Sequence, residues 1–589
     1  MPVPSPAPYR DKKSASQYLA DYLPAVLLAF LMIGLTYQAG FYDDDAVISI
    51  WHQEMTRSGE SLWSYCLRDF LNFIHFQGRF PLVFSFGLLP ALIWIGDSVE
   101  LYRAYFALIY LASFLVSQYG LAKLFGGHRP ATVVLVCFVA GVQLQNYHDP
   151  YTSYFGYLPV LAAFIIGALA SFDRLLDSRT SQSSNRKLLA FHLFWVTAAM
   201  LTWEIAIVIA AATAVQVLVS VRSWREKIRW LLVPCSWGAF FVVINLLLKR
   251  GSTNTGTLVE VSSPAKILQA YAVQLSSTVP FAAGDAYCPS IRQAFPKLGV
   301  ESLLGTLLIS FLLFKLIRTN REHHAPQSAR PLRVSILLLT SLCLLFIPPF
   351  LPALTAKYQN ELHYGTGYLQ RYIQNLGLAM AVGVVLLWLS AKRRLVPALG
   401  TWAIGIGIAT TFLLHNARNV EVIETRNAYW RAPRELAAAA LQASGSPQGV
   451  IGIIVDRNYL QRWETVDFSQ RHLGTPAPFK LHQEYVSGPD DRHWLMLGYT
   501  RFASKTTPAF AYVGTVAGPE YSTNNTLAVL RPLHLAINLL LEYAIQAPDG
   551  HVEQRTVPVL PVQSGQSVVF TLSEPQPIQR GSVRLVIKL

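Results

Sequence analysis

Long apolar runs divide the chain, and each is roughly 15 to 20 residues long, close to what an α-helix needs to cross a bilayer. Of the 589 residues, 52% are hydrophobic and 14% are charged, a balance too apolar for an ordinary soluble enzyme. In a bilayer, such runs satisfy their backbone polar groups as helices. The sequence therefore predicts an α-helical polytopic membrane protein of about eleven spans, at residues 22–39, 101–121, 131–145, 154–172, 188–202, 205–221, 230–248, 302–316, 334–351, 372–389 and 396–414.

One further apolar run, residues 80–96, contains Pro81 and Pro90, and counting it as a span would reverse the side of every later loop. If it lies at the membrane surface, all basic loops share the side of the basic amino terminus, as the positive-inside rule requires. We therefore expect a non-spanning segment here and a carboxyl terminus outside. The net charge of +14 then reflects topology and not nucleic-acid binding.

The first apolar run also resembles a signal peptide, because a basic start precedes it and small residues follow it. We expect an uncleaved anchor, since the run is long for a signal sequence.

The composition changes after residue 414, which predicts two domains. Residues 1–414 form the transmembrane domain, and residues 415–589 are expected to form an extracytoplasmic α/β or β-rich domain. In the latter, a helix is expected from Pro433 to about residue 443, followed by a buried strand at 450–455 and late strands at 567–572 and 582–587. It contains no recognisable catalytic motif.

Three consecutive carboxylates, Asp43, Asp44 and Asp45, stand just after the first apolar run. Their mutual repulsion is costly, which favours a role in holding a cation, a metal or a reacting hydroxyl. The alternative is a solvated helix start, because Asp is a good N-cap. The same loop predicts two amphipathic helices, at residues 45–57 and 62–73.

Further acidic and imidazole groups lie in the next two outward turns. His148 and Asp149 can complete a metal site or bind sugar hydroxyls, and the alternative is a capped, solvated turn. Glu204 lies where two apolar runs meet with almost no loop between them. A carboxylate there is costly unless it faces the outer surface or a wet cavity, so function competes with a surface-turn role.

Cations also occur on the outer side, where topology does not require them. Lys249, Arg250, Lys357, His363 and Arg371 are all candidates to bind a phosphate, and arginine does so through two parallel hydrogen bonds. Interfacial snorkelling is the alternative for Lys249 and Arg250. Arg371 is the favoured candidate, because it opens a span directly after a dense polar loop.

These short motifs together resemble the GT-C superfamily of integral membrane glycosyltransferases, which use polyprenyl-phosphate-linked sugars. The resemblance covers the layout of the whole membrane part, although each motif is weak alone. It rests on Tyr42-Asp43-Asp44-Asp45, Gln77-Gly78-Arg79-Phe80, Leu101-Tyr102-Arg103, His148-Asp149, Thr202-Trp203-Glu204 and Arg371.

The resemblance carries specific implications for the site. In protein O-mannosyltransferases and lipid A aminoarabinose transferases, the first-loop acid serves as catalytic base or organises the site, a role that would fall to Asp44 or Asp45. Arg79 becomes a further site candidate, and the implied location is a bacterial inner membrane with the active site outside. No acceptor-recognition motif of oligosaccharyltransferases is matched, so transfer of whole glycans to asparagine is less expected.

The expected function is transfer of one sugar from a polyprenyl-phosphate carrier to a hydroxyl of a glycan, lipid or protein acceptor. Outer cations would hold the phosphate while an Asp takes the acceptor proton. A divalent cation holding the carboxylates and the phosphate is left open. A transporter or lipid flippase is the alternative class, and it would place charges near mid-membrane. A noncatalytic assembly or receptor protein is a third possibility.

Overall fold

The computed structural model falls into two compact units: Met1–Gln38, Glu60–Ala91 and Glu100–Glu421 form the first, and Ala39–Gly59, Leu92–Val99 and Val422–Leu589 the second. The second unit therefore includes parts of the first loop. The residues that the structure describes are 14–37, 39, 45, 51–96, 98–145, 148–177, 182–253, 263–281, 298–322, 331–362, 367–390, 395–430, 432–445, 450–455, 479–482, 491–499, 509–517, 520–530, 538–559, 567–572, 574–579 and 582–588.

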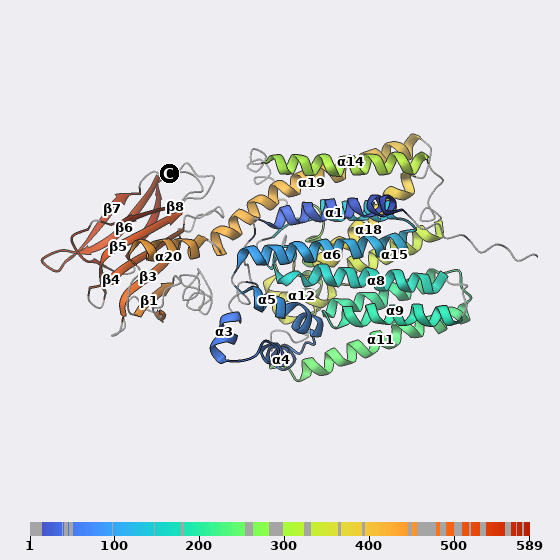
Figure 1. The fold of residues 1–589 in the computed structure, drawn as a ribbon, viewed down its shortest axis with the longest axis horizontal. Coiled ribbons are helices and arrows are strands. Elements are labelled where there is room, and N and C mark those ends of the chain that lie inside the picture. Colours follow the sequence, from blue (N-terminus) through green and yellow to red (C-terminus); the bar gives the residue numbers. More distant parts are fainter. Residues whose placement is uncertain are drawn as a thin grey trace, which may run out of the picture. The chain divides into compact units, whose positions relative to one another are not determined.

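All eleven expected spans fall on helices, many of which run alongside one another in the first unit (Figure 1). Among the residues that the structure describes, seven helices are long and apolar enough to cross a membrane by length and composition, namely those that begin at Ala15, Val99, Tyr157, Trp224, Val300, Pro331 and Arg371. The eleven are α1 (Ala15–Tyr37), α6 (Val99–Phe125), α7 (His128–Ala140), α8 (Tyr157–Asp177), α9 (Gln182–Met200), α10 (Val208–Val219), α11 (Trp224–Arg250), α14 (Val300–Glu322), α15 (Pro331–Phe346), α18 (Arg371–Ser390) and α19 (Leu395–Trp430).

The helix α7 is shorter than its expected span, because it ends at Ala140 and Gly141 caps it. The amide of Gly141 donates to the carbonyl of Cys137 at 3.0 Å. Residues 142–145 then leave the helix. Their polar side chains thereby become available to the site described below.

The ambiguous run, residues 80–96, is interrupted and short. It contains the π-helical turn η2 (Phe84–Leu88) and the helix α5 (Leu89–Ile95). At 1.5 Å per residue its helical part extends about 18 Å, whereas the hydrocarbon core is about 30 Å thick. This geometry agrees with a non-spanning segment. The expected amphipathic helices of the first loop are also present, as α3 (Trp51–Ser58) and α4 (Leu62–Asn72).

A buried ion pair joins three helices of the first unit. The guanidinium of Arg333 in α15 forms two hydrogen bonds with the carboxylate of Asp173 in α8, one of them 2.6 Å from Nη2 to Oδ2. Arg333 also donates to the carbonyl of Leu124 in α6. Both charged groups are largely buried, so the loss of one would leave the other buried without a counter-charge.

Replacing Arg333 by methionine should lower the free energy of unfolding by about 3–5 kcal/mol, because Asp173 would remain buried without a counter-charge. The double variant Arg333→Met/Asp173→Asn should recover much of this loss. Thermal unfolding of the detergent-solubilised protein measures both effects. Arg68→Met is the matched control, because its ion pair with Glu60 is exposed. Equal stability of Arg333→Met and Arg68→Met would contradict this account of the pair.

The second unit is built on one sheet with strand order β10-β6-β9-β5-β4-β3-β1-β2, in which β7 also pairs with β6 and β8 with β5. β1 pairs in parallel with β2 and β3, and the other pairs are antiparallel. The strands are β1 (Val450–Val455), β2 (Phe479–His482), β3 (Asp491–Tyr499), β4 (Ala509–Val516), β5 (Tyr521–Leu530), β6 (Asn538–Gln546), β7 (Val552–Pro558), β8 (Ser567–Thr571), β9 (Ile578–Gln579) and β10 (Arg584–Lys588).

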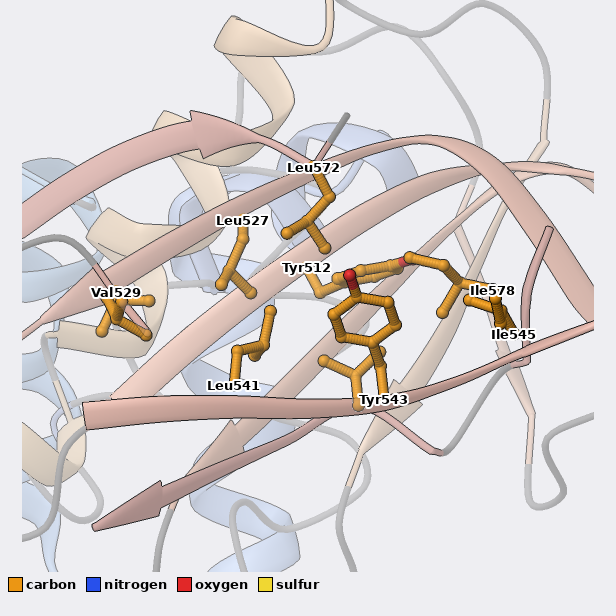
Figure 2. Close-up of a cluster of buried hydrophobic side chains, with 10 residues drawn as sticks. Tyr512, Leu527, Val529, Leu541, Tyr543, Ile545, Leu572 and Ile578 are labelled. Carbon is orange, nitrogen blue, oxygen red and sulfur yellow. The ribbon is translucent and has the colours of Figure 1, made fainter. Parts of the chain in front are cut away.

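The sheet carries its own hydrophobic core, and the helix α20 (Ala432–Ala443) packs against β4 and β5. Tyr512, Leu527, Leu541 and Ile578 are fully or almost fully buried in that core (Figure 2). The β-rich fold expected of the carboxyl-terminal part is therefore confirmed, whereas its boundary at residue 414 and its extracytoplasmic location stay predictions. The predicted strand at residues 450–455 coincides with β1, and the two late strands coincide closely with β8 and β10.

Candidate functional site

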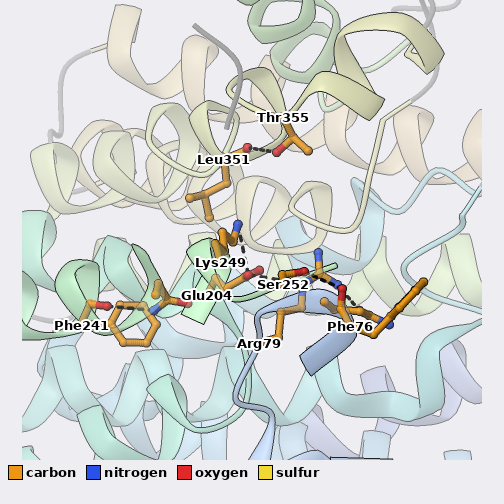
Figure 3. Close-up of polar contacts among 10 residues, drawn as sticks. Phe76, Arg79, Glu204, Phe241, Lys249, Ser252, Leu351 and Thr355 are labelled. Carbon is orange, nitrogen blue, oxygen red and sulfur yellow. Dashed lines mark hydrogen bonds and ion pairs between the residues drawn. The ribbon is translucent and has the colours of Figure 1, made fainter. Parts of the chain in front are cut away.

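Three charged side chains meet in the first unit: Arg79, Glu204 and Lys249. Arg79 Nε lies 3.3 Å from Oε1 of Glu204, and Lys249 Nζ lies 3.5 Å from the same oxygen (Figure 3). Their side chains are 13%, 18% and 20% exposed, so each is largely but not wholly removed from solvent. Two cations against one carboxylate leave one positive charge uncompensated within the group. We call these three residues the charge cluster.

A glycine allows the first loop to approach α11 closely enough to form the charge cluster. Gly78 follows the π-helical turn η1 (Phe73–Gln77) and has a φ of +61°. A Cβ atom there would lie 2.7 Å from Cα of Lys249. The position thus requires glycine both for its backbone conformation and for the close contact. Arg79, the next residue, is thereby brought beside Lys249.

Hydrogen bonds hold the same two segments together. Thr253 donates its amide to the carbonyl of His75 at 3.2 Å, and Ser252 donates its hydroxyl to the carbonyl of Phe76 at 2.5 Å (Figure 3). The chain just beyond α11 is therefore fixed to the turn that precedes Arg79.

Aromatic rings surround the guanidinium of Arg79. Its Cζ lies 4.5 Å from the ring centroid of Trp203, and Trp203 stacks on Tyr157 with centroids 5.0 Å apart. Trp203 has an extended backbone and is followed by the short 3₁₀ helix η4 (Glu204–Ile207), which presents Glu204 beside the same guanidinium. The ring stack orients Arg79 and shields its charge from water.

Two tyrosines between α15 and α18 also lie within electrostatic reach of Arg79. Tyr358, in α17 (Ala356–Glu361), and Tyr368, just before α18, have ring centroids 4.2 Å apart. Burial raises the pKa of Tyr358 to about 12, although Arg79 opposes the shift, and burial also raises the pKa of Tyr368. Both phenols therefore remain protonated near neutral pH and can donate hydrogen bonds.

Glu204 itself is ionised. Burial alone would raise the pKa of this carboxyl, but Arg79 and Lys249 hold it below its ordinary range. Because Arg79 and Lys249 lower its basicity, Glu204 is a partner for cations and a poor candidate for a general base.

An apolar cavity of about 420 Å³ lies beside the charge cluster. Arg79 and Glu204 are among its lining residues, and most of the remaining lining belongs to α9 and α11. Phe240, which is 63% exposed, is one of the lining residues, so the cavity is accessible from the outside of the bundle. The apolar lining is formed mainly by Leu193, Val196, Met200, Leu201, Trp237, Phe240, Phe241, Ile244 and Leu248.

Arg371, which the sequence favours as the residue that binds the phosphate, is buried at the start of α18. Its Nη1 donates to Oε1 of Gln145 at 3.0 Å. The side chain of Gln145 also bonds both the amide and the carbonyl of Gly367, at 2.9 and 2.8 Å. Within the described part of the chain, Arg371 has no carboxylate partner. A buried guanidinium in such surroundings favours an anionic ligand.

The two side chains of the His148–Asp149 turn make different contacts. Asp149 accepts hydrogen bonds from the amides of Gln145, Tyr151 and Thr152, at 2.8 to 3.2 Å. The turn is therefore capped, as in the alternative that the sequence offered, but Asp149 is fully buried and not solvated. The ring of His148 instead lies 5.4 Å from that of Tyr368, which places it near the tyrosine pair.

The remaining candidates are placed as follows. Arg250 is exposed, and Lys357 forms an exposed ion pair with Glu361 at 3.9 Å. Asp45 is buried in the second unit. Asp43, Asp44 and His363 lie outside the described residues. In the described ranges, no three His, Cys, Asp or Glu side chains are grouped so that they could hold a metal ion.

Sequence reasoning treated Arg79, Glu204 and Lys249 as separate candidates and missed the tyrosines around them. Tyr157, Tyr358 and Tyr368 resemble the interfacial aromatic residues that are common at span ends. One pattern in the sequence could have pointed to Tyr358, because it directly follows Lys357 in a dense polar loop.

No protein-family model matches the chain, and no curated protein matches it in sequence. Among solved structures, it is similar to ArnT from Cupriavidus metallidurans in the apo state, with a TM-score of 0.36 and 14% identity over 82% of this chain and 93% of that one. It is also similar to the archaeal oligosaccharyltransferase AglB from Archaeoglobus fulgidus in complex with an inhibitory peptide and a dolichol-phosphate, with a TM-score of 0.37 and 9% identity over 98% and 97% of the two chains. At this distance the similarity assigns neither a substrate nor a site residue.

Proposed function

We propose that the protein is a membrane glycosyltransferase that moves one sugar from a polyprenyl-phosphate carrier to an acceptor hydroxyl of a glycan, lipid or protein. The observation that carries this proposal is the apolar cavity between α9 and α11, with Arg79 and Glu204 in its lining and Lys249 beside them. Such a site suits an amphiphile with an apolar chain and an anionic head. A polyprenyl phosphate has that chemistry.

The two parts of the donor match the two parts of the site. Isoprenoid units in the cavity would bury apolar surface against α9 and α11, worth about 25 cal/mol per Å². The phosphodiester carries one negative charge, and the charge cluster has one positive charge in excess. Charge-assisted hydrogen bonds from Arg79 and Lys249 would then hold the phosphate.

Arg371 is a third cation for the same reaction. Its neutral partner Gln145 leaves the guanidinium charge available, and His148 and Tyr368 connect its surroundings to those of Arg79. Arg250 and Lys357 are exposed and contribute at most to the wider positive field, and His363 stays a candidate for binding the phosphate.

The proposed step is a single displacement. The acceptor oxygen attacks the anomeric carbon, the bond from that carbon to the phosphate oxygen breaks, and the polyprenyl phosphate leaves with the bonding electrons. The acceptor proton passes to Asp44 or Asp45, with Asp43 in the same cluster. The anomeric configuration inverts. A divalent cation on these carboxylates remains the alternative way of activating the hydroxyl.

Lys249→Gln should weaken binding of farnesyl phosphate to the full-length protein in detergent on the order of 10-fold, since it removes one of the two cations at the phosphate. Isothermal titration calorimetry measures the dissociation constant. Lys266→Gln is the matched control, because it removes the same charge from an exposed position in α12 (Pro264–Ser276). Equal affinities for the two variants would place the phosphate elsewhere.

A further inference from the structure

Glu204 pairs with two cations, and neither nitrogen–oxygen distance is as short as in a tight charge-assisted hydrogen bond. Its Oε1 is 3.3 Å from Arg79 Nε and 3.5 Å from Lys249 Nζ, whereas tight charge-assisted bonds between nitrogen and oxygen measure about 2.7–2.9 Å. Glu204 also lines the apolar cavity. Its carboxylate therefore occupies the region that an anionic headgroup would have to reach.

We propose that Glu204 is a positioning residue that acts as an internal counter-anion, holding Arg79 and Lys249 in place and competing with the donor phosphate for them. This inference rests on the proposed function. In the empty site, the carboxylate offsets the repulsion between these two largely buried cations and keeps them close together. When a phosphate enters, the same two cations redistribute between the phosphate and Glu204.

The competition matters most after the reaction. The donor is a phosphodiester with one negative charge, but the product is a phosphomonoester with about −1.5 to −2 charges near pH 7. A site with two unopposed cations would bind this product more tightly than the donor. Glu204 lowers the net charge of the cluster from two to one and thereby favours product release.

A purely structural role for Glu204 predicts the opposite change in affinity. If the carboxylate served only to hold the cations, its removal would loosen Arg79 and Lys249 and weaken phosphate binding. If it competes, its removal strengthens binding. The sign of the change therefore separates the two roles.

Glu204→Gln keeps the shape of the side chain and removes its charge. Farnesyl phosphate, titrated calorimetrically into the full-length protein in detergent, is expected to bind Glu204→Gln on the order of 10-fold more tightly than the unmutated protein. In a sugar-transfer assay, KM for the donor and kcat should both fall, because release of the product becomes slow. Glu60→Gln is the matched control, since Glu60 also pairs with an arginine, the exposed Arg68, and is not among the residues that line the apolar cavity.

Glu204→Asp provides a second variant if Glu204→Gln does not fold. It keeps the charge but withdraws the carboxylate by one methylene, so it should tighten binding in the same direction and by a smaller factor. No binding of farnesyl phosphate to the unmutated protein would overturn the proposed function and this inference with it. A different outcome would overturn this inference alone. In that outcome the unmutated protein binds farnesyl phosphate and Lys249→Gln weakens the binding, but the folded Glu204 variant binds no more tightly than the unmutated protein.

Discussion

Asp44→Asn or Asp45→Asn should reduce the rate of sugar transfer by roughly 100- to 10,000-fold, the usual contribution of a general base. Asparagine is nearly isosteric with aspartate, so expression and membrane insertion should be unchanged. At least one of the two variants is expected to be close to inactive. The measurement is the turnover number of each purified variant with a polyprenyl-phosphate-linked sugar.

Chelation of the unmutated protein separates the two roles open to the Asp cluster. Loss of activity that a divalent ion restores would indicate a metal held by the carboxylates. Insensitivity to the chelator would indicate base catalysis. Normal transfer by Asp44→Asn, Asp45→Asn and the double variant would show that the cluster is only a helix start.

Gly78→Ala is expected to lower kcat/KM by about 100-fold or more, because misplacing a reacting group by even 1 Å has effects of that size. The new Cβ would meet the backbone of Lys249 at 2.7 Å, and the positive φ would be strained in addition. The end of α11 must then shift, which separates Lys249 from Glu204. Steady-state kinetics of the folded variant measures the loss.

Gly59→Ala is the matched control for this prediction. Gly59 has a similar φ of +67°, but no atom lies within 4 Å of its added Cβ. Both variants therefore carry the backbone strain, of about 1–2 kcal/mol, and only Gly78→Ala carries the collision. Equal activity of the two variants would show that the close contact between the first loop and α11 is not needed for activity.

The helices and strands could be predicted well because apolar length and alternation are local properties of the sequence. β1 was located to the residue, and all eleven expected spans are helical. The end of α7 was misplaced because Gly141 stops the helix, whereas the apolar pattern continues past it. The capping role of Asp149 was also readable, since it bonds residues only two and three positions ahead.

The assembly of the site could not be predicted from the sequence alone. Glu204 and Lys249 stood out as charges beside apolar runs, and Arg79 entered only through the family resemblance. The three are far apart in the chain and meet only through tertiary packing. The close approach at Gly78 depends on the end of α11, which no local pattern encodes. Tyr358 and Tyr368 were missed because interfacial aromatic residues have the same appearance in a sequence.

The most direct test of the central claim is sugar transfer by the purified protein in detergent micelles. A micelle has no compartments, so a transporter or flippase has nothing to move there, whereas a transferase still changes its substrate. We predict that a radiolabelled sugar leaves its polyprenyl-phosphate carrier and appears on an acceptor hydroxyl, with free polyprenyl phosphate as the second product. The assay uses the sugar-lipids and acceptors extracted from the native membrane. If the folded protein binds the carrier but leaves every labelled sugar on its lipid, it is not a glycosyltransferase.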